Sequence, residues 1–401
     1  MQAVRPRRYI ELLRAPQVGR QFVAGSIGRL PYGMVALATI LTLRHFDFSY
    51  AEVGLVAGAW GLATGATAPL LGRMVDRLGQ TRVLAWTACG CAAGQVALLA
   101  AASERVPVAG LVALAMAAGA ASPPIGPCMR ALWPGLVPAE RLDAAFTLDA
   151  LQLEMIFIVG PVLTTALATS LSPQVAFATA TACQAGGALV FAAAPASRAW
   201  RPDPVSDDGP RRGALSSPGI RVLVGALAVA ALSLGVLEIG ITAFAEHEGS
   251  RSDAGWLFAL WSVGSLAGGL WYGARRWQGS PDRRFLAVSA LFALGLVPLP
   301  LAGSLAAFGV LVTVAGLALS PSSAIGYSLV GSLAPAGAVT EAYAWQIVAY
   351  VGGSALGAWL AGVMVDAVSV DAALTCAPLA AAAGLALALA GRRSLATPTR
   401  A

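Results

Sequence analysis

The sequence predicts an all-α membrane protein in which twelve transmembrane helices form two pseudo-symmetric six-helix bundles. Three observations predict this fold: the apolar composition, the recurrence of apolar runs long enough to cross a bilayer, and motifs of the first half that recur in the second. Of 401 residues, 57% are hydrophobic and 11% are charged, and the mean hydropathy is +0.73. A soluble domain carries about one-quarter charged residues, so most of this chain is expected to lie in lipid.

Apolar runs long enough to span a bilayer, which takes about 20 residues as a helix, follow one another from end to end of the chain. Together they use most of the sequence and leave no room for a soluble enzyme domain. The predicted spans are residues 18–43, 51–72, 83–103, 107–129, 144–170, 173–194, 219–244, 253–274, 285–303, 306–330, 340–366 and 371–391.

Motifs of the first six spans recur in the same order in the last six. Gly72 at the end of the second span corresponds to Gly273 in the eighth, at an offset of 201 residues. Gly160 in the fifth span corresponds to Gly357 in the eleventh, at an offset of 197 residues. Such a repeat is typical of transporters built from two related halves around a site near the middle of the membrane.

A polar segment rich in proline separates the two halves, and the hydrocarbon core of a membrane excludes such a segment. We therefore expect three units. They are an N-terminal six-helix bundle of residues 1–194, a cytoplasmic linker of residues 195–218, and a C-terminal six-helix bundle of residues 219–401.

The basic residues are distributed unevenly across the predicted membrane. All 26 are arginines, and if the N-terminus is cytoplasmic only Arg44, Arg105 and Arg251 fall outside, with Arg29 inside the first span. This asymmetry is the positive-inside pattern, so both termini are predicted to lie in the cytoplasm. The complete absence of Lys indicates a GC-rich bacterial genome, and the plasma (inner) membrane is then the expected location. The formal charge of +6 then needs no nucleic-acid partner.

The stretch GRMVDRLGQTR, between the second and third spans, contains a spaced set of Gly, Asp and Arg residues. The residues concerned are Gly72, Asp76, Arg77, Gly79 and Arg82. Their spacing resembles the signature loop of the major facilitator superfamily, and the organisation of nearly the whole chain is similar to that of the family's twelve-helix members. The resemblance implies a transporter and not an enzyme.

The resemblance also implies a role for this loop as a cytoplasmic gate motif. By the family's pattern, Asp76 lies against the N-terminus of the eleventh helix, which begins near Thr340. Backbone N–H groups at a helix N-terminus favour a carboxylate, so the contact would hold the cytoplasmic gate closed in an outward-facing state. The alternative is that the loop is only a positive-inside topology signal.

Four charged residues lie well inside the predicted spans, away from their ends, where charges are costly and are usually paired or functional. Arg29 and Glu154 lie at matching depth, and we expect either a structural ion pair or a role in transport. Asp149 lies about one turn from the cytoplasmic end, where water can solvate it. Glu238 has no basic neighbour in its helix, and an unpaired carboxyl in an apolar setting favours its protonated form, as a proton-coupling site requires.

The pair Gly160-Pro161 in the fifth span resembles the Gly-Pro element of the family's antiporter branch. Because proline removes a backbone donor and bends a helix, we expect a hinge or a close contact between the halves here. Aromatic and hydroxyl side chains of other spans are candidates for lining a substrate cavity. These are Tyr32, Trp60, Ser122, Ser320, Tyr327 and Tyr350.

These features predict a secondary active transporter that works by alternating access, and favour proton-coupled efflux of a hydrophobic or cationic compound. The alternatives are an importer or facilitator of a small metabolite and, in a different class, a membrane sensor or structural protein that transports nothing. No cofactor is expected besides the proton gradient. No metal site is expected. An intramembrane enzyme would need a nucleophile or a metal set, and the only histidines, His45 and His247, fall in predicted outward loops, which argues against one. We expect a monomer whose partners are a small-molecule substrate and the bilayer.

Overall fold

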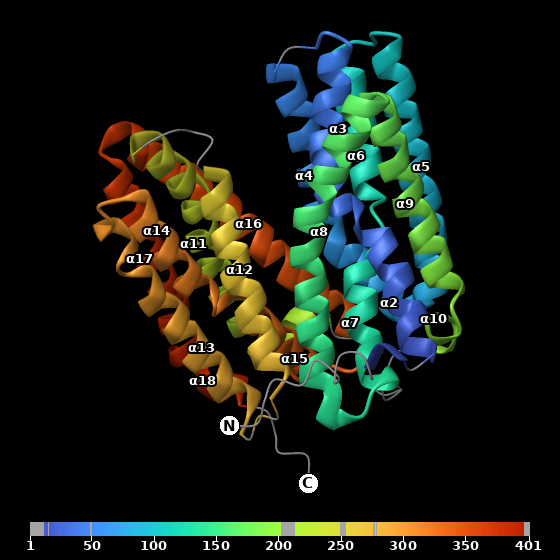
Figure 1. Cartoon of the computed structure of the whole chain (residues 1–401). Coiled ribbons are helices and arrows are strands. Elements are labelled where there is room, and N and C mark those ends of the chain that lie inside the picture. Colours follow the sequence, from blue (N-terminus) through green and yellow to red (C-terminus); the bar gives the residue numbers. More distant parts are fainter. Residues whose placement is uncertain are drawn as a thin grey trace.

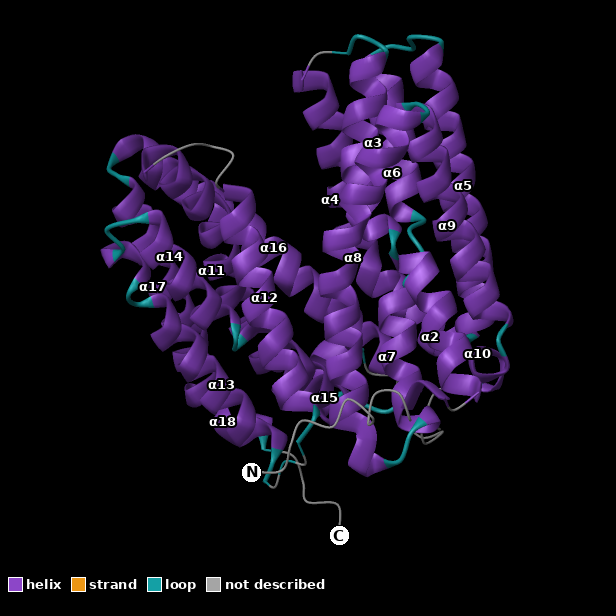
Figure 2. Ribbon diagram, viewed as in Figure 1, coloured by secondary structure: helices purple, strands orange, loops and turns teal. Residues whose placement is uncertain are grey.

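The computed structural model describes residues 12–14, 16–48, 50–201, 213–248, 254–275, 277 and 279–396. Within these ranges the regular elements are helices, joined by short loops (Figure 2). Twelve helical segments in the described part of the chain are long and apolar enough to cross a membrane. This agrees with the predicted all-α membrane fold. Residues 202–212 of the predicted linker lie outside the described ranges.

The N-terminal half contains the first six spans, and two of them consist of two helices each. Its elements are α2 (Pro16–Arg29), α3 (Pro31–His45), α4 (Tyr50–Leu78), α5 (Gln80–Ser103), α6 (Val108–Ala120), α7 (Ile125–Leu136), the 3₁₀ turn η1 (Ala139–Arg141), α8 (Leu142–Ser170) and α9 (Pro173–Ala193). The predicted linker begins with a short helix, α10 (Pro195–Ala199), which packs on α9, α5 and α2. This part of the linker therefore belongs structurally to the N-terminal bundle.

The C-terminal half contains the other six spans. Its elements are η2 (Ala214–Ser216), α11 (Pro218–Glu248), α12 (Ala254–Gly273), α13 (Pro281–Leu296), η4 (Leu299–Leu301), α14 (Leu305–Gly316), α15 (Leu319–Leu333), α16 (Val339–Ala367), α17 (Val370–Ala390) and α18 (Arg392–Leu395).

The two halves meet at one end of the molecule and diverge toward the other (Figure 1). Contacts between them are made by α4 and α7 with α16, by α8 with α12 and α15, and by α7 with α15. We call the end where they meet the contact end, and the opposite end, which carries the turn after α3 and the turn after α5, the splayed end.

Some spans are broken near their middle, and polar side chains satisfy the backbone groups that the breaks release. Between α6 and α7 the chain leaves the helix at Pro123 and Pro124. The carbonyl oxygens of Gly119 and Ala120, just before this break, accept hydrogen bonds of 3.1 Å from the hydroxyls of Thr64 and Thr67 of α4. Because lipid offers no hydrogen bonds, backbone exposed by a break must find such partners inside the protein.

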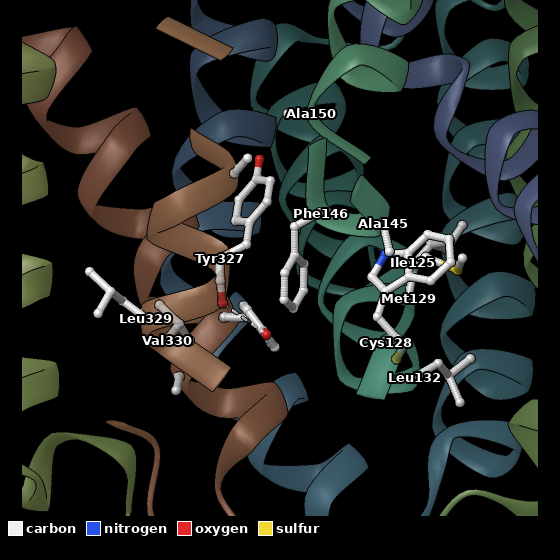
Figure 3. Packing of buried hydrophobic residues seen from close by; sticks show 14 of the residues in the cluster. Ile125, Cys128, Met129, Leu132, Ala145, Phe146, Ala150, Tyr327, Leu329 and Val330 are labelled. Carbon is white, nitrogen blue, oxygen red and sulfur yellow. Dashed lines mark hydrogen bonds between the residues drawn. The ribbon is translucent and has the colours of Figure 1, made fainter. Parts of the chain in front are cut away.

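The hydrophobic core at the contact end is shared by both halves (Figure 3). It joins Met129 of α7 and Phe146 of α8 to Leu329 of α15. The rings of Phe146 and Tyr327 lie 6.4 Å apart between centroids. This packing closes the contact end and places α7, α8 and α15 next to one another.

Candidate functional site

Asp76 lies near the end of α4, at the contact end, and caps the first turn of α16 in the other half. Its Oδ1 accepts a hydrogen bond of 3.0 Å from the backbone N–H of Thr340, and its Oδ2 one of 2.8 Å from that of Glu341. The first N–H groups of a helix have no partner within the helix, and the helix dipole favours a negative charge beside them. The structure thus contains the contact that the sequence resemblance implies, with Asp76 only 4% exposed.

Gly72, one turn earlier in α4, allows the two helices to approach closely enough for this contact. A Cβ atom at this position would lie 2.8 Å from the Cα of Glu341 and 2.9 Å from the carbonyl oxygen of Thr340. Gly79 takes a φ of +85°, which glycine adopts at little cost, and so turns the chain from α4 into α5.

Arg73, which sequence reasoning did not single out, adds a two-pronged ion pair to the same contact. Its Nε and Nη2 donate to the Glu341 carboxylate at 3.1 and 2.7 Å. The sequence contained a signal for this pair, because Glu341 lies at the start of the eleventh span and that helix is expected to face the arginine-rich loop. The motif residues Arg77 and Arg82 instead have exposed side chains.

A second ion pair joins the halves at the contact end, at the position related to the first by the internal repeat. Asp143, the second residue of α8, lies 197 residues before Thr340, the offset that separates Gly160 from Gly357. Arg284 of α13 donates to the Asp143 carboxylate at 2.7 Å, and the same nitrogen lies 2.6 Å from the hydroxyl of Tyr272. The second half lacks an aspartate corresponding to Asp76. In this second ion pair the acid, Asp143, belongs to the N-terminal half, whereas in the first pair the acid, Glu341, belongs to the C-terminal half.

A buried charge cluster lies deeper in the membrane region, where α2, α7, α8 and α15 meet. Asp149 accepts hydrogen bonds of 2.9 Å from Arg29 Nη2 and of 2.9 Å from Arg130 Nε. Arg130 also donates to the hydroxyl of Tyr327 at 3.0 Å, with its guanidinium carbon 3.8 Å from the centroid of that ring. Since Tyr327 belongs to the C-terminal half, the cluster connects the two halves.

The predicted pair of Arg29 with Glu154 is wrong, and Asp149 is not solvated but fully buried. Residues five apart on a helix point in directions that differ by about 140°, at 3.6 residues per turn. On α8, therefore, Asp149 faces the two arginines while Glu154 faces α12, where it accepts a hydrogen bond of 3.0 Å from the Ser265 hydroxyl. Depth alone could not distinguish these two faces.

Arg130 was missed because the predicted fourth span ended at residue 129, which made it a loop arginine. In the structure this span continues to Leu136, and Arg130 is 3% exposed. The cluster thus holds two guanidinium groups and one carboxylate. Within the described residues, Nε and Nη1 of Arg29 and Nη1 of Arg130 are buried without a hydrogen-bond partner.

On the splayed side of the cluster, Glu154 of α8, Glu238 of α11 and Tyr350 of α16 lie near one another, and we call the space that they border the opening. Tyr350 of α16 has Glu154, Tyr327 and Glu238 within electrostatic range. Its side chain is nevertheless 46% exposed, so protein does not fill the space on its exposed side. Glu238 is exposed on α11, which corrects the expectation that its side chain is buried.

The other candidate cavity residues lie inside the bundles. Tyr32 is half-buried, with its hydroxyl 3.5 Å from the carbonyl oxygen of Pro123, and Trp60 is also half-buried. Ser122 accepts a hydrogen bond of 3.5 Å from Gln184 of α9. Ser320 is 1% exposed and packs on α12, where a Cβ on Gly269 would lie 2.6 Å from its hydroxyl oxygen.

The Gly160-Pro161 element makes a close helix contact within one half. A Cβ on Gly160 would lie 2.7 Å from the Cα of Gly33 of α3. The predicted alternative of a contact between the halves is therefore wrong, because α3 and α8 belong to the same bundle. Helix α8 continues through Pro161 to Ser170. In the part of the chain that the structure describes, no group of His, Cys, Asp and Glu side chains is arranged to hold a metal ion.

Comparisons with known proteins agree with this architecture. The chain is similar in structure to a bacterial homologue of the iron transporter ferroportin in an outward-facing state, with a TM-score of 0.74 and 14% identity over 95% of this chain and 99% of that one. It is also similar to the human organic anion transporter MFSD10, with a TM-score of 0.70 and 15% identity over 94% and 99% of the two chains. For the E. coli fucose:proton symporter FucP the TM-score is 0.67, with 14% identity over 94% and 99%.

At these identities the likeness establishes the fold alone. No curated protein sequence matches the chain significantly. The sequence profile of the Major Facilitator Superfamily, however, matches residues 22–245, which is more than half of the chain. The chain therefore belongs to the Major Facilitator Superfamily and is a membrane transporter, not an enzyme.

Proposed function

We propose that the protein exports a small apolar or cationic compound across the plasma membrane in exchange for protons, by alternating access of a site between its two halves. In this proposal the contact end is cytoplasmic, and the structure represents the outward-facing state. The observation that carries the proposal is the pair of ionic contacts, Asp76 with α16 and Asp143 with Arg284, that close one end, while Tyr350 and Glu238 have exposed side chains.

The assignment of the contact end to the cytoplasm rests on arginine placement. The exposed residues Arg77, Arg82 and Arg198 lie at this end, whereas Arg44 and Arg105 lie at the splayed end. An excess of arginine in short loops is typical of the cytoplasmic side. Both termini would then be cytoplasmic, and the protein would act as a monomer in the inner membrane of a bacterium.

The preference for apolar or cationic substrates rests on the side chains that border the opening. Glu154 and Glu238 supply negative charge, and Tyr350 supplies an aromatic surface that attracts cations and apolar groups. The two arginines nearby, Arg29 and Arg130, are buried and hydrogen-bond to the Asp149 carboxylate, so neither guanidinium group is placed to contact a ligand in the opening directly.

The same two carboxylates support proton coupling, because a proton and a cationic substrate can compete for one carboxylate. Glu154 also joins the halves through its hydrogen bond with Ser265. Protonation of Glu154 would remove the negative charge that makes this bond strong. Loading a proton would thereby weaken a contact between the halves and link the pH gradient to the conformational change.

Proteoliposomes test this proposal. Purified protein should release protons from the lumen of acid-loaded vesicles when a lipophilic cation such as ethidium is added outside, and should exchange internal for external ethidium at equal pH. Exchange of a neutral sugar without proton movement would favour the facilitator. The absence of exchange for any offered compound, from protein that is folded and correctly inserted, would favour a sensor or structural protein.

A further inference from the structure

A groove of about 660 Å³ runs along the outer surface of the N-terminal half, between α2 and α9. Small residues such as Ala24 and Gly187 form its buried floor, and the exposed side chains of Val23, Ile27 and Val190 form its walls. Its lining is almost entirely apolar. Arg20 is the charged residue of the lining, and its exposed side chain lies at the end of the groove nearest the contact end.

The groove has the length of one membrane leaflet. At about 1.5 Å per residue, Arg20 to Ile27 extends about 11 Å along α2, and Thr179 to Val190 about 17 Å along α9. Half of a hydrocarbon core is about 15 Å thick. Arg20 is the fourth residue of its span, which begins at Gln17, so its guanidinium lies at the level of lipid headgroups.

The groove is closed on its inner side and leads nowhere. A Cβ on Gly187 would lie 2.1 Å from the backbone nitrogen of Gly28, and one on Gly25 would lie 3.5 Å from the Phe191 ring. The two helices are therefore in contact behind the groove. Helix α9 lies on the side of the N-terminal half away from the C-terminal half (Figure 1). An occupant would remain in place and would not pass to the opening.

We propose that an anionic glycerophospholipid of the leaflet at the contact end, which we assign to the cytoplasm, occupies this groove. One acyl chain lies between α2 and α9, and the phosphate pairs with Arg20. The exposed Arg198 of α10, which packs on α2, adds positive charge at the same end. Basic residues between transmembrane helices on the cytoplasmic side are suited to bind anionic headgroups.

Native mass spectrometry of the purified full-length protein tests this, with added phosphatidylglycerol and phosphatidylcholine of identical acyl chains as competing probes. The wild type should retain one lipid with preference for phosphatidylglycerol. Arg20→Gln should lower the ratio of bound phosphatidylglycerol to phosphatidylcholine about fivefold. Gly186→Leu should lower retention of both lipids, because Gly186 lines the groove and has open space around its Cβ position.

Two matched variants serve as controls. Arg221 is exposed and is the fourth residue of its span in the other half, as Arg20 is in the first. Gly61 is an exposed glycine of α4 with open space around its Cβ position. Arg221→Gln and Gly61→Leu should leave both the ratio and the retention unchanged.

Three results would overturn the proposal. An equal loss of preference in Arg20→Gln and Arg221→Gln would mean diffuse attraction to the whole charged surface. Retention in Gly186→Leu equal to that of the wild type would place the lipid outside the groove. A protein dimer that Gly186→Leu dissociates would assign the groove to a second copy of the chain.

Discussion

Arg130 of the N-terminal half places its guanidinium carbon 3.8 Å from the ring centroid of Tyr327 of the C-terminal half while pairing with Asp149 behind it. One side chain thus belongs both to a buried ion cluster and to the contact between the halves. Two guanidinium groups share one carboxylate here. Removing the carboxylate therefore leaves two buried positive charges unpaired, whereas removing one guanidinium group leaves a balanced pair.

This inequality predicts the relative stability of two variants. Asp149→Asn strands two buried arginines and should lower the free energy of unfolding by about 3–5 kcal/mol or more. Arg29→Gln leaves the pair of Arg130 with Asp149 intact and should cost clearly less, since the remaining charges balance. Thermal unfolding of the purified variants in one detergent measures the order. An equal loss in both would mean that Asp149 does not hold both arginines.

The contact of Asp76 with α16 predicts a conformational effect without loss of folding. Asp76→Asn removes the charge that the first turn of α16 stabilises, an effect of about 1–2 kcal/mol. The variant should insert normally, transport slowly and populate the inward-facing form more than the wild type does. Arg77→Gln, an exposed residue of the same motif, is the control. If Asp76→Asn transports at the wild-type rate, the motif acts only as a topology signal and not as a gate.

Gly72 permits a separate test of the same contact by size instead of charge. Gly72→Ala places a Cβ 2.8 Å from the Cα of Glu341, and overpacking of this kind costs about 1–3 kcal/mol. Gly54→Ala adds the same atom to the same helix where nothing lies within 4 Å. The first should weaken closure of the contact end and slow transport, and the second should do neither, as cysteine accessibility at the start of α16 would report. Equal accessibility in both variants would contradict the close approach.

Glu238 and Glu154 differ in predicted phenotype because only one of them touches the other half. Glu238→Gln should bind an apolar substrate but lose selectivity for cations. Glu154→Gln keeps a polar partner for Ser265 but no longer changes charge, so it should bind substrate and lose the dependence of transport on the pH gradient. Transport assays with and without a gradient measure both. Proton-driven accumulation retained in Glu154→Gln would move coupling to Glu238.

Much of the fold could be predicted from the sequence, because a helix that crosses lipid needs about 20 predominantly apolar residues. Apolar length gave all twelve spans, and the signature loop located the contact of Asp76 with the helix that begins at Val339. What the sequence could not give was rotation about each helix axis, which decides that Asp149 and not Glu154 meets Arg29. The breaks and overrun ends of helices were equally hidden, so Arg130 was assigned to a loop.

The central claim is that the two halves close at opposite ends in alternation, and a pair of distances measured by double electron–electron resonance tests it most directly. Spin labels at Ser103, at the end of α5, and at exposed Leu301 report on the splayed end. Labels at Arg77 and Arg283 report on the contact end. In Asp76→Asn the first distance should shorten and the second lengthen relative to the same labels without that change. Two distances that stay constant in every variant, substrate and pH condition would contradict alternating access.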